Sequence, residues 1–232
     1  MHPNYIGFRL LRLATERGQV DCRYYQSSLP ILEYWKEGDE EVKTTKQKQE
    51  RSSAVIFVTG VGGDWGTPAK GLYPRLCGSL CKEEGINGLR IRYRHPTDLS
   101  ESVFDVLAGI SYLKQEQKGI KSIGLVGHSF GGAVVLQAAT VALDIVSTVV
   151  TLATQSYGAI YAAPRLKHGT SLLLVHGTED GVLPVYCSEQ VYQVAHEPKQ
   201  LVICEGAGHS LDEVSEDVYR LVNGWLIEHL KH

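Results

Sequence analysis

One serine stands where an apolar run gives way to a helical pattern, with a glycine two residues away on each side. The pentapeptide is Gly127-His128-Ser129-Phe130-Gly131, and the run SIGLV precedes it. A serine on such a sharp strand-to-helix turn, a nucleophile elbow, presents its hydroxyl for attack on a carbonyl. The strained backbone costs about 1–3 kcal/mol, and glycines avoid collisions with the neighbouring strand and helix. A glycine-rich turn with an idle serine is the alternative, and partner residues must decide between the two.

Two residues later in the chain could activate that hydroxyl. A serine needs a base to accept its proton and a carboxylate to orient the base. After an elbow of this kind, the acid and then the histidine follow on loops after later strands. Asp180 ends the run SLLLVHGTED, and His209 follows KQLVICEGA. The sequence therefore predicts a triad of Ser129, Asp180 and His209, with Glu179 and Glu205 as alternative acids.

Other residues near these motifs have predicted supporting roles. An acyl-transfer intermediate carries a negatively charged oxygen, which two N–H donors stabilise. We expect one donor to be the Phe130 N–H, at the positive end of a helix, and the other to be the Val61 N–H. Val61 lies in a glycine-rich turn that is not a dinucleotide loop, because Trp65 replaces the third glycine of that motif. His128 and His176 are predicted to be packed neighbours of the site.

The elements that must position these residues alternate along the chain. Continuous apolar runs, typical of strands buried on both faces of a parallel sheet, cover 54–60, 87–94, 122–129, 146–154, 171–180 and 199–207. Helical patterns cover 71–85, 98–114, 130–143, 183–196 and 215–232. Asp98 and Glu101 predict a capping box. Residues 8–27 predict two antiparallel edge strands around a turn at Arg17-Gly18. This alternation indicates an α/β fold with helices on both faces of the sheet.

Composition narrows the class of protein. The chain has 232 residues, and 43% of them are hydrophobic. These values favour a single domain that spans residues 1–232. A net charge of −3 gives no nucleic-acid footprint. The most apolar stretch, 133–154, contains Gln137 and Asp144 and is not expected to span a membrane. Five scattered cysteines without zinc spacing predict free thiols, no metal and a cytoplasmic location. The polar segment 36–53 predicts a mobile, dispensable surface loop.

Four motifs together resemble a known superfamily: TGVGG, GHSFGG, HGTEDGVLP and GAGHS. Over residues 54–232 the chain resembles the α/β-hydrolases, in particular small lidless members similar to dienelactone hydrolases and bacterial carboxylesterases. It differs at two points. The usual His-Gly before the oxyanion residue is Thr59-Gly60 here, and dienelactone hydrolases proper use a cysteine where this elbow has serine. The connection 155–170 is too short for a helical cap domain.

The resemblance implies an α/β-hydrolase fold without a large cap, no cofactor, and a small-molecule acyl substrate. Its leading reaction is hydrolysis of an ester or thioester through an acyl-Ser129 intermediate. The alternatives are a peptidase or amidase, an acyltransferase, and a binding protein with little turnover, since these share the constellation. Candidate pocket residues, for which ordinary packing is equally open, are Trp65, Tyr157, Val182 and Leu183. Arg94 and His95 could meet an anionic substrate or have a surface role.

Overall fold

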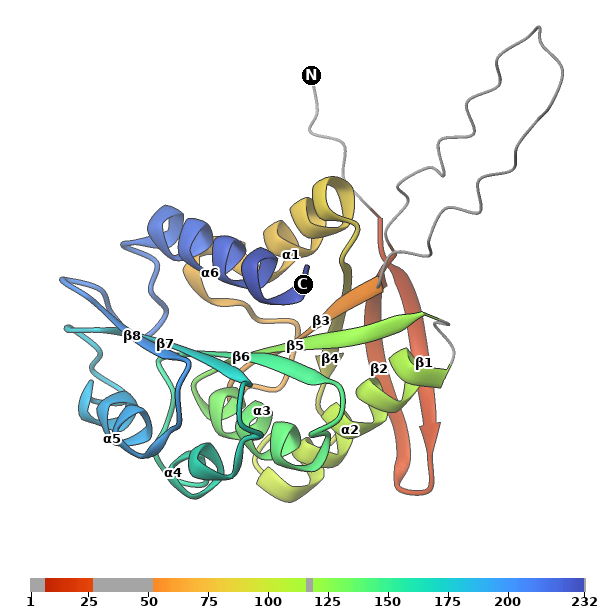
Figure 1. Cartoon of the computed structure of the whole chain (residues 1–232), viewed down its shortest axis with the longest axis horizontal. Helices are drawn as coiled ribbons and strands as arrows, with labels where there is room; N and C mark the ends of the chain where they lie inside the picture. The colour runs from red at the N-terminus through yellow and green to blue at the C-terminus, as the bar shows by residue number, and fades with distance from the viewer. Residues whose placement is uncertain (1–6, 27–51, 116–118, 232) are drawn as a thin grey trace, which may run out of the picture.

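A single mixed sheet forms the middle layer of the protein (Figure 1). The computed structural model describes residues 7–26, 52–115 and 119–231. The sheet has eight strands in the order β1-β2-β4-β3-β5-β6-β7-β8. The six apolar runs all form strands: β3 (Ser52–Val58), β4 (Asn87–Arg92), β5 (Ile120–His128), β6 (Val146–Leu152), β7 (Ser171–Gly177) and β8 (Lys199–Cys204). They pair in parallel, which confirms the predicted fold class.

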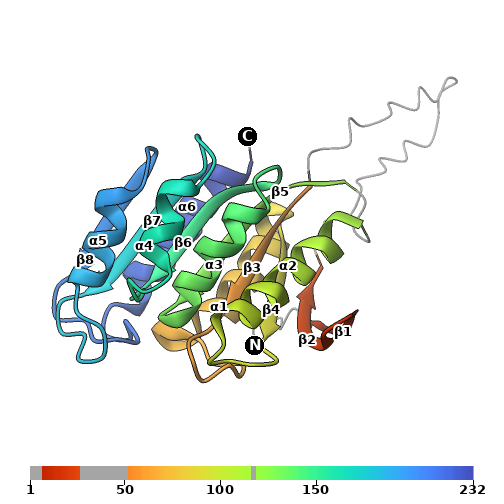
Figure 2. The ribbon, with the colours of Figure 1, turned by 90° about the horizontal axis from the view of Figure 1, so that it is seen from below.

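Helices cover both faces of this sheet (Figures 1 and 2). One face carries α1 (Pro68–Ser79) and α6 (Ser215–Leu230), and the other carries α2 (Leu99–Gln115), α3 (Phe130–Val141), α4 (Ala159–Ala162) and α5 (Tyr186–Val194). Neighbouring strand residues face different cores: Ile56 packs with α2 and α3, whereas Val55 and Phe57 pack with α1 and α6. This two-sided burial explains why the strands are continuously apolar. Of the helices described, none is long and apolar enough to cross a membrane.

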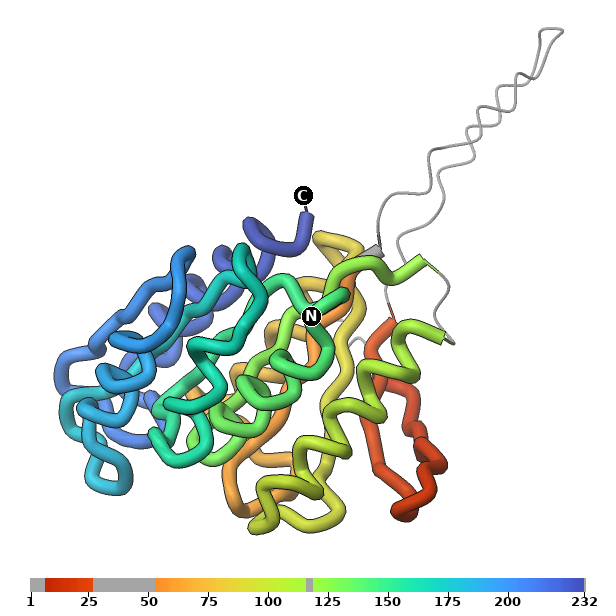
Figure 3. Tube along the Cα trace, turned by 60° about the horizontal axis from the view of Figure 1, so that its bottom comes forward, coloured from red at the N-terminus to blue at the C-terminus, as the bar shows by residue number. Residues whose placement is uncertain are grey.

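The N-terminal hairpin extends the sheet beyond β4. β1 (Arg9–Thr15) pairs antiparallel with β2 (Gly18–Tyr25), which is itself antiparallel to β4. The predicted edge hairpin is confirmed. Its turn is one residue earlier than predicted, at Glu16 and Arg17, because Gly18, with a φ of 117°, already begins β2. The hairpin lies alongside α2 (Figure 3).

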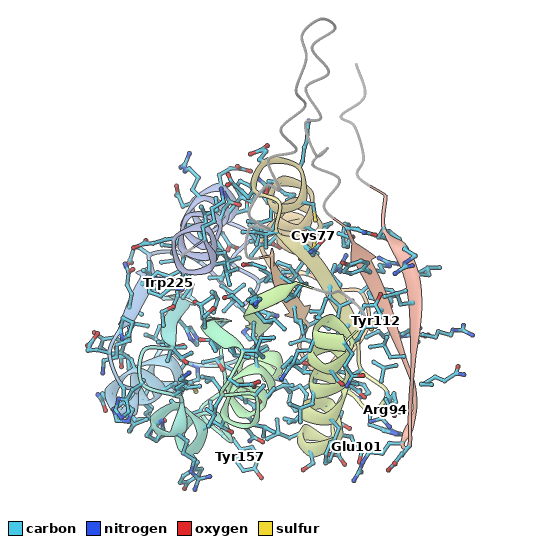
Figure 4. The ribbon with its side chains drawn as sticks, turned by 45° about the vertical axis from the view of Figure 1, so that its right-hand side comes forward. Cys77, Arg94, Glu101, Tyr112, Tyr157 and Trp225 are labelled. Atoms are coloured by element: carbon cyan, nitrogen blue, oxygen red, sulfur yellow. The ribbon has the colours of Figure 1, made fainter. Side chains whose placement is uncertain are left out.

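Arg94 fastens the hairpin to α2. Its guanidinium donates hydrogen bonds to Asp105, to Glu101 and to the Arg17 carbonyl oxygen. Figure 4 shows Arg94 and Glu101 together beside α2. The Arg94 side chain is only 9% exposed. Because these partners occupy its donors, Arg94 has a structural role here and is not free to meet an anionic substrate.

Several local predictions need correction. Glu101 N–H donates to Asp98 Oδ1 at 3.0 Å, but the Glu101 carboxylate binds Arg17 and Arg94, so the capping box is one-sided. The helix predicted over 71–85 begins at Pro68 and ends in a π-helical turn, η1 (Leu80–Glu84). The prediction that the connection 155–170 is too short for a helical cap domain needs no correction, since its regular structure is α4 and a 3-10 turn, η2 (Ala163–Arg165). The loop predicted over 36–53 lies outside the described residues, except that Ser52 and Ser53 belong to β3.

Candidate active site

Ser129 lies on the corner between β5 and α3 with a φ of 56° and a ψ of −120°. Its N–H donates to the Leu152 carbonyl oxygen at 2.8 Å, which fixes the corner against β6. A Cβ on Gly127 would lie 2.1 Å from the Gly131 carbonyl oxygen, and a Cβ on Gly131 would lie 2.4 Å from the Thr59 oxygen. The expected steric need for both glycines is confirmed.

Adding one methyl group at Gly127 should therefore destabilise the fold. Gly127→Ala forces its Cβ into the backbone of α3, and overpacking of this kind costs about 3 kcal/mol. Gly78→Ala is the matched control, because nothing lies within 4 Å of a Cβ there and alanine favours its helix. Urea unfolding should show a large loss for the first variant and none for the second. Equal stability of the two would contradict the steric role of Gly127.

The loops after β7 and β8 bring Asp180 and His209 together. His209 Nδ1 donates to Asp180 Oδ2 at 2.8 Å. The alternative acids do not make this contact: Glu179 and Glu205 are exposed. No hydrogen bond within the described parts of the chain joins the Ser129 hydroxyl to the His209 ring. Contacts between nucleophile and base are often long without substrate and shorten in its complex.

The turn after Asp180 surrounds its carboxylate with donors. The Val182 and Leu183 N–H groups donate to Asp180 Oδ1 at 2.8 and 2.9 Å, and the side chain has no exposed surface. Burial raises the pKa of Asp180, but the hydrogen bonds from His209, Leu183 and Val182 outweigh it and hold the pKa below its usual value. Asp180 is therefore a carboxylate at neutral pH. Val182 and Leu183, two of the four predicted pocket residues, thus donate backbone hydrogen bonds to Asp180. The sequence did not indicate this role.

His128 lies against His209, the predicted base, on the side of the elbow. Its ring lies 4.8 Å from the His209 ring between centroids, and its Nε2 is 2.9 Å from the His209 carbonyl oxygen. A carbonyl only accepts, so Nε2 carries the proton. Burial lowers the pKa of His128 to about 4. His128 is thus neutral near pH 7, and its N–H fixes the backbone of the residue whose ring contacts Asp180.

This buried neutral histidine should make stability depend on pH. Histidine in an unfolded chain titrates near pH 6.5, so between about pH 6.5 and pH 4 the unfolded state binds a proton that folded His128 does not. The free energy of unfolding should fall by about 3 kcal/mol across this window as the pH drops. His128→Gln keeps an N–H donor without the titration, so this share of the loss should be absent. Urea unfolding of both proteins at several pH values measures this loss of stability. Equal losses in the native protein and in His128→Gln would show that His128 is not its source.

A third set of contacts holds the His209 loop against the start of α1. Ala69 N–H donates to the Ser210 carbonyl oxygen at 2.7 Å, and Lys70 N–H donates to Asp212 Oδ1 at 2.8 Å. Ala69, Lys70 and Gly71 have positive φ values of 49°, 49° and 90°, which aim these donors at the loop. Within the loop, Glu213 accepts from the Gly208 N–H at 3.0 Å. No pattern in the sequence indicated that Asp212 and Glu213 hold this loop.

The glycine-rich turn after β3 lies beside the serine. A Cβ on Gly60 would be 3.3 Å from Ser129 Cβ, and Gly60 accepts from the Gly63 N–H at 3.0 Å to close the turn. Val61 is within this turn, and Phe130 is the first residue of α3, where amides have no acceptor inside the helix. Both predicted oxyanion donors therefore belong to segments next to Ser129, and their role stays a prediction.

The two remaining pocket candidates, Trp65 and Tyr157, lie in different environments. The Trp65 ring lies 4.2 Å from the Arg23 guanidinium, and the buried Arg90 donates to the Trp65 carbonyl oxygen. Tyr157 is 76% exposed and lies on the α4 side of the molecule (Figure 4). Their pocket role stays a prediction. Among the described residues, no group of three or more His, Cys, Asp or Glu is placed to hold a metal ion, and all five cysteines are free.

A family model adds an independent comparison. The model of the dienelactone hydrolase family matches residues 90–221, more than half of the chain. This chain belongs to the dienelactone hydrolase family. The match includes Ser129, Asp180 and His209, and the protein is a hydrolase. This family member has serine at the elbow, and its predicted membership in the α/β-hydrolases is confirmed.

Solved structures show the same fold at low sequence identity. A dienelactone hydrolase from Anabaena variabilis is 17% identical with a TM-score of 0.76, and the match covers 98% of this chain and 100% of that one. Est1E from Butyrivibrio proteoclasticus is 17% identical with a TM-score of 0.71, over 96% and 99%. A lidless α/β serine hydrolase from Xanthomonas campestris is 17% identical with a TM-score of 0.68, over 100% and 98%.

One curated relative is similar over a shorter stretch. A kynurenine formamidase from Meyerozyma guilliermondii is 30% identical over an alignment of 119 residues, and the match covers 48% of this family member. The match covers 42% of that relative, so the chain spans less than half of the length of the protein it resembles.

Proposed function

We propose that this protein is a serine hydrolase that cleaves small esters or thioesters through an acyl-Ser129 intermediate. The observation that carries the proposal is the 2.8 Å hydrogen bond from His209 to Asp180, on loops that follow β7 and β8. Parallel strands deliver these loops to the same sheet edge as the Ser129 corner at the end of β5. A strained serine, a histidine and a buried carboxylate at one edge are the parts that acyl transfer requires.

The proposed reaction has two halves. Ser129 Oγ attacks the carbonyl carbon while His209 Nε2 accepts the hydroxyl proton, and the carbonyl oxygen becomes an anion bound by the Val61 and Phe130 N–H groups. The carbonyl re-forms as the bond to the leaving group breaks, and His209 returns the proton to that group. A water molecule then attacks acyl-Ser129 and loses a proton to His209. The bond between the acyl carbon and Ser129 Oγ breaks, His209 returns the proton to Oγ, and the acid is released. Asp180 stabilises the imidazolium in both halves.

The connection between β6 and β7 favours small or accessible substrates. It contains only the four residues of α4 and the three residues of η2 as regular structure. An open edge of this kind suits a compact acyl group better than a long buried chain. Trp65, Tyr157, Val182 and Leu183 remain the proposed lining of the pocket.

Amide hydrolysis is a second candidate, which the relative named as a kynurenine formamidase favours. The same triad serves both reactions, because His209 can donate its proton to a leaving amine as it does to a leaving alcohol. The two candidates differ in the bond that is cleaved and share every proposed catalytic residue.

Covalent labelling tests the nucleophile before any substrate is known. A fluorophosphonate probe reacts with an activated serine, so mass spectrometry of the native protein should find the label on Ser129 alone. Heat-denatured protein is the control, since it retains every serine without the site. Native protein without label would support the binding-protein alternative. A panel of matched ester, thioester and formamide substrates then separates the enzymatic candidates.

A further inference from the structure

His176 is a buried polar residue that the proposed reaction does not use. It lies on β7, four residues before Asp180, and has no exposed surface. Its Nε2 lies 2.9 Å from the Leu183 carbonyl oxygen and 3.1 Å from Asp180 Oδ2, and its Nδ1 lies 2.7 Å from Ser188 Oγ on α5. A buried imidazole with a contact on each ring nitrogen has a fixed orientation.

These contacts also fix its tautomer. The Leu183 carbonyl oxygen can only accept, so the proton is on Nε2. In the neutral ring Nδ1 then accepts, and the Ser188 hydroxyl, which is fully buried, donates to it. The N–H that results points toward the turn that contains the acid.

That N–H holds two parts of the acid's surroundings at once. Leu183 donates its N–H to Asp180 Oδ1 and accepts from His176, so the turn is closed against β7. The same His176 nitrogen faces Asp180 Oδ2, the oxygen that accepts from His209. With Oδ1 held by the turn and Oδ2 between two histidines, the carboxylate has one orientation.

We infer that His176 is a positioning residue for Asp180, and that Ser188 holds His176 in the tautomer this requires. The inference deepens and rests on the proposed function. His176 acts through its Nε2–H, which closes the turn at Leu183 and faces Asp180 Oδ2, and so aligns the carboxylate toward His209. Although His176 does not touch the substrate, its contact matters because a shift of about 1 Å in a group that positions the reacting atoms can lower the rate about 10²-fold.

Three variants and one matched control test this inference. His176→Leu removes the N–H and should lower kcat about 10²-fold with little change in KM. His176→Gln replaces the N–H with an amide donor and should recover most of the rate. Ser188→Ala should lower kcat by a smaller factor. The control is Ser171→Ala, which also removes a buried 2.7 Å hydroxyl hydrogen bond, to Thr148, and should lower Tm similarly without lowering kcat.

A double-mutant cycle separates positioning from general destabilisation. If His176 acts through Asp180, His176→Leu should have little further effect in an Asp180→Asn background. An undiminished kcat in His176→Leu, or an equal loss in both backgrounds, would overturn the inference. If His176→Leu does not fold, the pair Ser188→Ala and Ser171→Ala decides, and an equal kcat in these two would also overturn it.

A spectroscopic measurement makes the test independent of turnover. The proton between His209 and Asp180 should give a far-downfield NMR resonance, which His176→Leu should shift or broaden and Ser171→Ala should not. If Ser129→Ala and Asp180→Asn both retain activity, the proposed function fails while the resonance still tests His176. If those two variants lose activity, but His176→Leu changes neither the resonance nor kcat, only this inference fails.

Discussion

Asp180→Asn should lower kcat/KM by about 10⁴-fold, the scale of the corresponding change in serine proteases. One asparagine oxygen can still accept from the Val182 and Leu183 N–H groups, which leaves the amide NH₂ facing His209. Two donors cannot pair, so His209 must move its proton to Nε2. The nitrogen that should accept the serine proton is then already protonated. Steady-state kinetics with the best substrate of the panel measures the loss.

Glu205→Gln is the matched control for Asp180→Asn, because it makes the same chemical change in an exposed carboxylate on the turn after β8. It should retain nearly full activity. Circular dichroism should show the same fold for both variants. A mild defect in Asp180→Asn together with a severe one in Glu205→Gln would show that the contact with Asp180 is not the productive one.

Ser129→Ala should remove turnover by about 10³-fold or more, because the substitution removes the Oγ on which the proposed acyl intermediate forms. The substitution removes one oxygen atom and retains the Cβ, so the corner between β5 and α3 keeps its packing. The N–H bond to Leu152 belongs to the backbone and is unaffected. The variant should fold with the Tm of the native protein, lose fluorophosphonate labelling and still bind substrate.

Ser210→Ala is the control for Ser129→Ala, since Ser210 is an exposed serine next to the base and contributes its carbonyl oxygen, not its hydroxyl, to the contact with Ala69. The Ser210→Ala variant should still be labelled by the fluorophosphonate, and the label should still be on Ser129. Undiminished activity in correctly folded Ser129→Ala would reject the proposed nucleophile, and the acyl-enzyme mechanism with it.

Local patterns were enough to predict the sheet and its serine corner. Strands β3 to β7 follow from apolar runs, because a strand buried on both faces must be apolar throughout. The run that predicts β8 forms the edge strand, which is only partly buried. The corner follows from glycine spacing, because the backbone of α3 and the end of β3 leave no room for a Cβ at Gly127 or Gly131. In each case the physical cause lies within a few residues of the signal.

Features that depend on distant segments were not predictable in this way. The start of α1 departs from helical geometry because Ala69 and Lys70 donate to a loop near the C-terminus. The contacts of His128 and His176 join loops whose distance no local pattern encodes. Glu101 satisfied the capping pattern, yet its carboxylate pairs with two arginines from other elements. Tertiary partners decided each of these outcomes.

The left-handed turn at residues 69–71 bears on the order in which the parts of the proposed active site form during folding. Lys70 and Asp212 are 142 positions apart in the chain, so their bond closes only after the intervening strands have assembled. The serine corner needs only β5, α3 and their neighbours, whereas the base is held by contacts that span most of the chain. We therefore expect the serine corner to form early during synthesis and the loop with the proposed base to dock last, so that a half-made chain would carry no complete triad.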